Sequence, residues 1–195
     1  MYKIVEFSHI LISDFLSKLN TPSPVCIDAT CGMGNDTLHI AKCLDHKGII
    51  HAYDIQTVAI DATKELLNEN GYTNVLYHNT SHEHIDFNKI NLAIYNLGYL
   101  PGHDKSITTT PASSLNSLKK VLENIADEYL IILVLYPGHD TGLIESKLID
   151  DFCYNLKSGD YLVSKYQNYN RPTSPYIITI SKNKKWINWF TFFIF

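Results

Sequence analysis

The sequence predicts an α/β fold in which a seven-stranded, mostly parallel sheet carries helices on both of its faces. Three observations support this prediction. Strand-like and helix-like segments alternate along the chain as far as residue 156, as they do where helices connect parallel strands. The run from 129 to 136 is continuously apolar, which is typical of a strand covered on both faces. Two strand-like segments then close the chain without a helix between them, which indicates an antiparallel pair at the sheet edge.

The first half of the chain begins with an amphipathic helix, expected over residues 6–19. Its apolar side chains recur at spacings of three and four residues, which is the period of a helix with one buried face. They are Phe7, Ile10, Leu11, Phe15 and Leu19. The segment TPSP at 21–24 ends this helix. The elements expected next are a strand over 25–29, a helix over 36–44, a strand over 48–53, a helix over 57–70 and a strand over 75–77.

The second half continues the alternation. The expected elements are a strand over 91–95, a helix over 111–126 with proline in its first turn, a strand over 129–136, a helix over 141–156, and strands over 161–166 and 176–181. No repeat or long linker interrupts this order, so we expect residues 1–195 to form one domain. The last ten residues, 186–195, form an apolar tail. A membrane-spanning helix needs about 20 residues, so we expect no membrane span there.

Composition narrows the class of protein. Apolar residues make up 45% and charged residues 18%, which is typical of a folded globular chain. The formal net charge is −4, and this argues against general, non-specific binding of nucleic acid. The four cysteines form no CxxC pair and the amino terminus has no signal-peptide pattern, so we expect a reduced, cytoplasmic protein. The nine histidines lack the HExxH spacing, and no metal site is expected.

The loop after the first predicted strand, DATCGMGNDT at 28–37, is the strongest candidate for a cofactor site. Ligands of parallel sheets bind at the carboxyl ends of strands, and glycines allow the backbone to approach a ligand closely. Its acids suit a ligand with positive groups, such as the sulfonium and ammonium of S-adenosylmethionine, better than a pyrophosphate. The candidate cofactor-binding residues in this loop are Asp28, Thr30, Gly32, Gly34, Asn35, Asp36 and Thr37.

Two further strand ends extend this candidate site. Asp54 follows the second strand, twenty residues after Gly34, where a carboxylate can accept from both hydroxyls of a ribose. An acid at this position is shared with dinucleotide-binding proteins, so Asp54 alone does not separate the two cofactor classes. Ser81 and His82 follow the third strand, at the place where an adenine ring lies in sites of this kind.

The loop that follows the fourth predicted strand indicates an amine substrate. Asn96-Leu97-Gly98-Tyr99 is similar to the Asn/Asp-Pro-Pro-aromatic tetrad of amino-group methyltransferases, without the prolines. An amine attacks a methyl group through its lone pair, so an acceptor such as the Asn96 carbonyl must hold its N–H groups while Tyr99 packs a flat base. Asp104, in the same loop, and His139, after the fifth strand, are candidates for removing the proton from the product.

The motifs together resemble one bacterial family, the tRNA wobble-uridine 5-aminomethyl methyltransferases, formerly described as ribosomal-RNA methylases. The resemblance covers residues 8–182 and rests on DATCGMGNDT, YDIQ, NTSH, NLGYLPGHDKSITT and YPGHDTGLIE. The chain departs from the family at His103, where glycine is common, and in its longer apolar tail.

This resemblance implies a Rossmann-like class I methyltransferase fold and transfer of a methyl group from S-adenosylmethionine. The acceptor would be the 5-aminomethyl group of (2-thio)uridine at the tRNA wobble position. Family cofactor contacts would fall on Asn35, Asp36, Asp54, Gln56, Ser81 and His82, with Asn96 beside the transferred methyl group. Members of the family also form homodimers, so the resemblance implies a homodimer here.

A tRNA substrate has to be recognised by a chain of net negative charge. Anticodon loops present splayed bases, which aromatic side chains bind by stacking, together with a few phosphate contacts. Lys105, Lys165 and Arg171 are the candidates for phosphate contact with the anticodon stem-loop. The alternatives are the same chemistry on a ribosomal RNA base, a DNA base amine or a small amine, a nucleotide-binding oxidoreductase, and a non-catalytic RNA-binding module.

Overall fold

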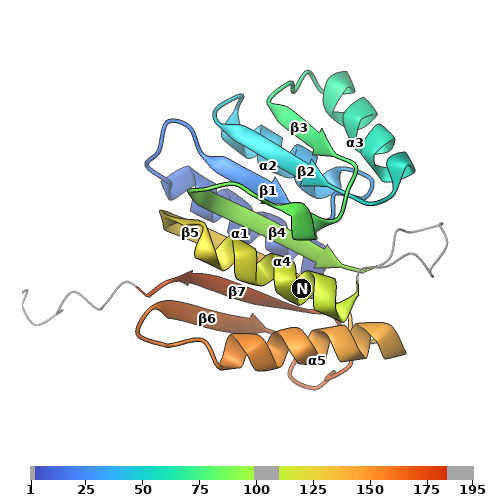
Figure 1. The fold of residues 1–195 in the computed structure, drawn as a ribbon, viewed down its shortest axis with the longest axis vertical. Coiled ribbons are helices and arrows are strands. Elements are labelled where there is room, and N and C mark those ends of the chain that lie inside the picture. Colours follow the sequence, from blue (N-terminus) through green and yellow to red (C-terminus); the bar gives the residue numbers. More distant parts are fainter. Residues whose placement is uncertain (1–2, 99–109, 184–195) are drawn as a thin grey trace, which may run out of the picture.

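The computed structural model describes residues 3–98 and 110–183, and these form a single seven-stranded sheet with helices on both faces (Figure 1). The strands are β1 (Val25–Asp28), β2 (Ile49–Tyr53), β3 (Val75–His78), β4 (Ile90–Leu97), β5 (Ile125–Leu135), β6 (Tyr161–Tyr166) and β7 (Tyr176–Lys182). Their order in the sheet is β3-β2-β1-β4-β5-β7-β6. The fold class expected from the sequence is confirmed.

Strand direction also follows the prediction. The five strands β1 to β5 are parallel to one another, whereas β7 runs antiparallel to both β5 and β6. The two closing strands therefore form an antiparallel pair at the edge of the sheet. The later of the two, β7, is inserted between β5 and β6.

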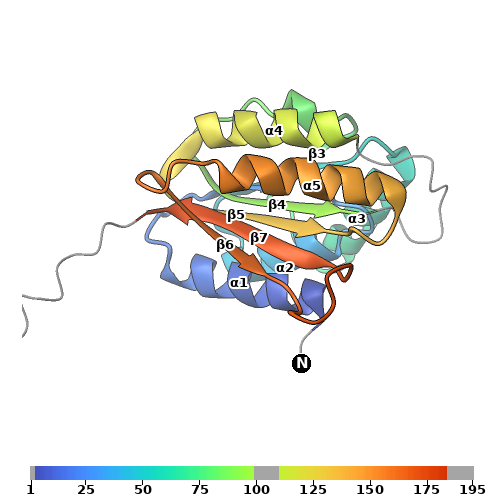
Figure 2. The ribbon, with the colours of Figure 1, turned by 90° about the horizontal axis from the view of Figure 1, so that it is seen from below.

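The helices divide between the two faces of the sheet, as Figure 2 shows from below. On one face lie α1 (Ile4–Lys18), α2 (Asn35–Leu44) and α3 (Thr57–Glu69), whose buried side chains share one apolar cluster. On the other face lie α4 (Pro111–Glu123) and α5 (Asp140–Tyr154), which share a second cluster. Side chains of β4 alternate between the two, because Leu92 and Ile94 join the first while Ala93 and Tyr95 join the second.

The largest difference from the predicted boundaries lies between α4 and β5. The helix expected to run to residue 126 ends at Glu123, where Asn124 takes a non-helical conformation with φ −121° and ψ 18°. The next strand begins at Ile125, because this residue pairs with Ile90 before the register shift that precedes Leu92. This tertiary pairing thus ends the helix before Ala126, which the sequence had placed in the helix. A 3₁₀ turn, η1 (His82–His84), was also not predicted.

Two other expectations concern a membrane-spanning helix and the apolar tail. Within residues 3–98 and 110–183, no helix is long and apolar enough to cross a membrane. The apolar tail at 186–195 lies outside the described residues.

Candidate functional site

A cavity of about 960 Å³ opens at the carboxyl ends of the parallel strands. Most of its lining comes from the ends of β1, β2, β3, β4 and β5 and from the segments that follow them, so residues far apart in sequence meet there. The chain leaves β1 for β2 on one side, while β4 lies on the other side of β1. The cavity therefore lies at the point of the sheet where the strand order reverses, which is where open α/β proteins bind ligands.

The loop between β1 and α2 is shaped by close contact with α3. Gly34 has φ +83°, and a Cβ built on it would lie 2.9 Å from the Cα of Thr63. Thr63 in turn donates its hydroxyl to the carbonyl of Gly32 over 3.0 Å. Only glycine accepts both the left-handed backbone and this close approach. Gly34 thus shapes the loop from behind, whereas Gly32 lines the cavity.

Asp28 lies behind the loop and is fully buried. Its Oδ2 accepts a hydrogen bond from the Thr37 hydroxyl at 2.6 Å, and its Oδ1 accepts one from the Thr30 N–H at 3.2 Å. Burial, followed by the nearby charge of Asp36, raises the pKa of Asp28 to about 7. Neither Asp28 nor Thr37 lines the cavity. In this structure the pair ties the strand end to the first turn of α2.

Asp54, which follows β2, does line the cavity. Its Oδ2 accepts from the N–H of Gly32 at 3.1 Å, and its Oδ1 accepts from the N–H of Gln56 at 2.9 Å. Burial raises the pKa of Asp54, while these backbone donors oppose that rise. A carboxylate fixed in this way keeps lone pairs for the two hydroxyls of a ribose.

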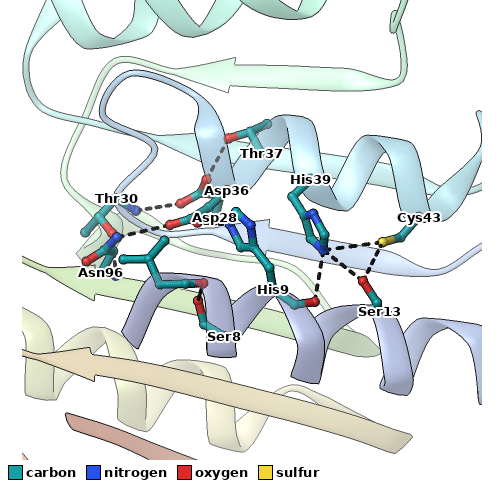
Figure 3. Close-up of polar contacts among 11 residues, drawn as sticks. Ser8, His9, Ser13, Asp28, Thr30, Asp36, Thr37, His39, Cys43 and Asn96 are labelled. Atoms are coloured by element: carbon teal, nitrogen blue, oxygen red, sulfur yellow. Dashed lines mark hydrogen bonds and ion pairs between the residues drawn. The ribbon is translucent and has the colours of Figure 1, made fainter. Parts of the chain in front are cut away.

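A polar network joins three elements beside this loop (Figure 3). Asp36, in the first turn of α2, accepts from the Asn96 side-chain amide through Oδ2 at 3.2 Å. Its Oδ1 lies 2.6 Å from Nε2 of His9 on α1. The Asn96 backbone N–H donates to the Thr30 hydroxyl at 2.8 Å, which fixes the end of β4 to the loop after β1.

The segment after β3 forms another wall. The Ser81 hydroxyl accepts from the N–H of Glu83 and begins the 3₁₀ turn. His82 is 5% exposed and meets the ring of Tyr95 edge-on. Burial lowers the pKa of His82 to about 4, so its imidazole is neutral near pH 7. The turn is held against α4, where Lys120 Nζ donates to the Glu83 carbonyl over 2.5 Å.

The end of β5 closes the remaining side. Tyr136 lines the cavity, and its ring lies 3.4 Å from the position of a Cβ at Gly98. Burial, and then the charge of Asp36, raises the pKa of Tyr136 to about 12. His139 also lines the cavity and begins α5, with its Nδ1 accepting from the Gly142 N–H at 3.1 Å.

The structure brings most of the sequence-predicted residues together around the cavity. The predicted residues in its lining are Thr30, Gly32, Asn35, Asp36, Asp54, Gln56, Ser81, His82, Asn96 and His139. Asp28, Gly34 and Thr37 lie behind the loop. Tyr99, Asp104 and Lys105 lie outside the described residues.

The two remaining candidates do not line the cavity. Lys165 is on β6, where its Nζ is 2.5 Å from Asp150 Oδ2 and 4.1 Å from the centre of the Tyr176 ring. Arg171 is exposed in the turn between β6 and β7.

Some residues at the site escaped sequence reasoning. Tyr136 was seen only as the end of a strand, although a tyrosine directly after a buried strand at the same rim is a signal of a site. Val5 of α1 and Thr173 of the β6–β7 turn also line the cavity, and no local pattern points to them. His9 reaches Asp36 from a helix whose apolar spacing explained only its packing.

No group of three or more His, Cys, Asp or Glu side chains that could hold a metal ion occurs in residues 3–98 and 110–183. The chemistry of the lining instead combines carboxylates, amides and backbone N–H groups with apolar surface. This set fits an adenosyl cofactor with a ribose diol and cationic groups, because Asp54 and Asp36 supply acceptors while Gly32 lets the backbone approach closely.

Comparison with known proteins places these features in one family. A family model described as "Putative rRNA methylase" matches residues 50–182. The chain is 33% identical over 196 residues to the chloroplastic tRNA (mnm(5)s(2)U34)-methyltransferase of Arabidopsis thaliana, covering 93% of this chain and 70% of the relative. A shorter match, 36% identical over 104 residues, is to ribosomal RNA small subunit methyltransferase H of Clostridium botulinum, covering 48% of this chain and 33% of the relative.

Solved structures agree with the sequence relatives. A Clostridium thermocellum structure with the same description as the family model superposes with a TM-score of 0.85 at 29% identity, covering 93% of this chain and 98% of the other. A Streptococcus mutans structure, described as "a putative methyltransferase" in complex with SAH, superposes with a TM-score of 0.78 at 31% identity. The overlap covers 93% of this chain and 99% of that one.

Proposed function

Because the chain belongs to this rRNA methylase family, we propose that it methylates the 5-aminomethyl group of (2-thio)uridine at the tRNA wobble position. Membership of this family shows that the chain is an S-adenosylmethionine-dependent methyltransferase of the rRNA and tRNA type. The product would be 5-methylaminomethyl-(2-thio)uridine. The name of the Arabidopsis relative, which specifies mnm(5)s(2)U34, supports this acceptor.

The observation that carries the amine acceptor is the orientation of Asn96. It lines the cavity at the end of β4, and its amide nitrogen is engaged by Asp36. The carbonyl oxygen, at the other end of the amide from this contact, can therefore accept an N–H from a ligand in the cavity. A substrate amine held through an N–H keeps its lone pair available for attack.

Bound S-adenosylmethionine supplies an electrophilic methyl group on a sulfonium. The chain's own residues then have three tasks. Asp54 and the Gly32 backbone would hold the ribose side of the cofactor, the charge of Asp36 would complement its positive groups, and Asn96 would orient the amine. As the nitrogen–carbon bond forms and the carbon–sulfur bond breaks, the amine becomes an ammonium that must lose one proton. We propose that His139, at the rim, or Asp104 receives this proton.

We also propose that Tyr99 packs against the wobble base and that Lys105, Lys165 and Arg171 contact phosphates of the anticodon stem-loop. The exposed turn that contains Arg171 also contains Tyr169, whose side chain is fully exposed and suited to stacking. A cytoplasmic location is proposed with this substrate.

A homodimer is proposed as well. Apolar side chains on the outer face of α5 support it, since Leu143 is 54% exposed, Ile144 62% and Tyr154 87%. Light scattering of the purified protein tests the proposal, and Ile144→Glu should shift a dimer toward monomer.

Nucleoside analysis of cells tests the proposed acceptor. In a strain that lacks this chain, bulk tRNA should accumulate the unmethylated 5-aminomethyl nucleoside, and re-expression should remove it. If ribosomal RNA loses a methylated base while the tRNA nucleosides stay unchanged, the acceptor is a ribosomal RNA base, as the name of the Clostridium botulinum relative would suggest.

A further inference from the structure

The contact between α1 and the end of β4 passes through one carboxylate. Asp36 Oδ1 lies 2.6 Å from His9 Nε2, and Asp36 Oδ2 lies 3.2 Å from Asn96 Nδ2. The Asp36 side chain is only 7% exposed and that of His9 is 25% exposed. Figure 3 shows the three side chains converging from α1, α2 and β4. Each oxygen of this carboxylate therefore faces a different partner.

This arrangement determines which end of the Asn96 amide faces the carboxylate. An ionised carboxylate accepts hydrogen bonds and donates none, so Asn96 must present its NH₂ group to Asp36. The carbonyl oxygen of Asn96 is then turned to the opposite side of the amide. A flipped amide would place two oxygens against each other and would offer donors, instead of an acceptor, to an amine.

His9 fixes the carboxylate itself. The terminal torsion of an aspartate is broad and roughly two-fold, so a carboxylate held at one oxygen alone can rotate. The short contact from His9 to Oδ1 removes this freedom and leaves Oδ2 directed at Asn96.

The imidazole of His9 is in turn held in place by α2. It stacks on the ring of His39 with centroids 4.1 Å apart and an interplanar angle of 8°. His39 Nε2 also lies 2.9 Å from the carbonyl oxygen of His9 and 2.9 Å from the Ser13 hydroxyl. His9 is therefore a fixed support and not a mobile surface side chain.

We propose that His9 is a positioning residue for the methyl transfer, acting through Asp36 to keep the Asn96 carbonyl directed at the substrate amine. The proposal rests on the proposed function, since it assumes that Asn96 holds an amine. It assigns to the first helix of the chain a role in turnover that is separate from cofactor binding.

Two substitutions of His9 separate its hydrogen bond from its packing. His9→Phe keeps an aromatic ring to stack on His39 and removes the donor to Asp36, whereas His9→Gln keeps an N–H donor and removes the ring. With tRNA carrying 5-aminomethyluridine, we expect His9→Phe to lower kcat by about 10- to 100-fold, the cost of losing a hydrogen bond to a charged group. His9→Gln should retain most of kcat. The KM for S-adenosylmethionine should change far less than kcat in both variants.

A double-mutant cycle tests whether His9 acts through Asn96. In an Asn96→Ala background, His9→Phe should cause little further loss of kcat, because the group that it positions is already absent. Ser13→Ala, which removes a contact of His39 but leaves the pair of His9 and Asp36, is the matched control and should keep wild-type kcat. Thermal melting checks that each variant folds, and His9→Met, which also lacks a donor, replaces His9→Phe if that variant does not fold.

The outcomes are distinguishable. Wild-type kcat in His9→Phe, equal losses in His9→Phe and His9→Gln, or fully additive losses in the cycle would each overturn the positioning role. If the wild-type protein methylates no aminomethyl group at all, the proposed function fails, and this result is read from the wild type before any variant is compared.

Discussion

The backbone N–H of Gly32 donates to Oδ2 of Asp54 across 3.1 Å, joining the loop after β1 to the acid after β2. A second backbone donor, the N–H of Gln56, holds the other carboxylate oxygen at 2.9 Å. The acid is thus oriented by the protein itself. In a binding site, groups held in their bound geometry lower the entropy cost of taking up a ligand.

Removing this acid should weaken binding of S-adenosylmethionine. Asp54→Ala loses hydrogen bonds to a charged group, which are worth about 1.5–3 kcal/mol, so we expect the Kd for the cofactor to rise about 10- to 100-fold. Calorimetric titration measures this directly. Asp61→Ala, on the exposed side of α3, removes the same charge away from the cavity and should leave Kd unchanged. Equal Kd values for the two variants would contradict the role given to Asp54.

Two glycines with left-handed backbones allow the steric role of Gly34 to be measured. Gly34 has φ +83° and Gly71 has φ +78°, but only Gly34 has an atom, the Cα of Thr63, within 2.9 Å of a built Cβ. Gly71→Ala should lower the free energy of unfolding by about 1–2 kcal/mol, the cost of a left-handed conformation alone. Gly34→Ala should cost about 1–3 kcal/mol more because it also displaces α3, and should weaken cofactor binding. Urea unfolding of both variants checks this, and equal losses would refute the contact.

The pH dependence of stability should reflect the buried imidazole of His82. Burial lowers the pKa of His82 from its ordinary value of 6.5 to about 4. Between these values the unfolded chain binds the proton and the folded chain does not, so the free energy of unfolding falls as the pH drops from 6.5 to 4. His82→Gln should make this fall shallower, with His51, whose pKa is also lowered to about 4, retaining part of it.

Urea unfolding at a series of pH values measures this effect as the difference in stability between His82→Gln and the wild type. As the pH falls, the free energy of unfolding of His82→Gln should rise relative to that of the wild type. A difference that stays constant from pH 7 to pH 4 would show that His82 is not the titrating group.

Binding of an anticodon stem-loop should depend unequally on the two basic residues near β6 and β7. Lys165 already pairs with Asp150 at 2.5 Å, whereas Arg171 is exposed in a turn beside Tyr169. The logarithm of the binding constant falls linearly with the logarithm of the salt concentration, and each phosphate contact to a single strand adds about 0.7 to the steepness of this slope. Arg171→Ala should therefore reduce that slope by about 0.7, and Lys165→Ala by less. Fluorescence anisotropy over a salt series measures both, and an unchanged slope for Arg171→Ala would exclude it as a phosphate contact.

Local patterns were enough to predict the sheet, because strand and loop signals at 25–37 and 129–136 are short-range properties of the sequence. The end of α4 was missed because pairing of Ile125 with Ile90 is a tertiary contact that overrides local propensity. The site was likewise predicted where its residues follow strands, as Asp54 and Asn96 do, since the ends of parallel strands meet at one edge.

Residues that reach the site from other elements were beyond local reasoning. His9 lies 27 positions from Asp36, and its spacing in α1 gave no reason to set it apart from a solvent-facing histidine. Asp28 was grouped with the cavity acids, but in the fold it turns toward Thr37 behind the loop. The direction of a side chain at a strand end depends on the packing of the following helix, which the motif does not encode.

Methyl transfer in a purified system tests the central claim most directly. The protein is incubated with S-adenosylmethionine labelled in its methyl group and with tRNA carrying either 5-aminomethyluridine or unmodified uridine at the wobble position, and the digested nucleosides are identified by mass. We expect label only in 5-methylaminomethyluridine from the aminomethyl tRNA, and a loss of about 10- to 100-fold in Asn96→Ala. Equal labelling of both tRNAs, or label in another nucleoside, would contradict an aminomethyl acceptor.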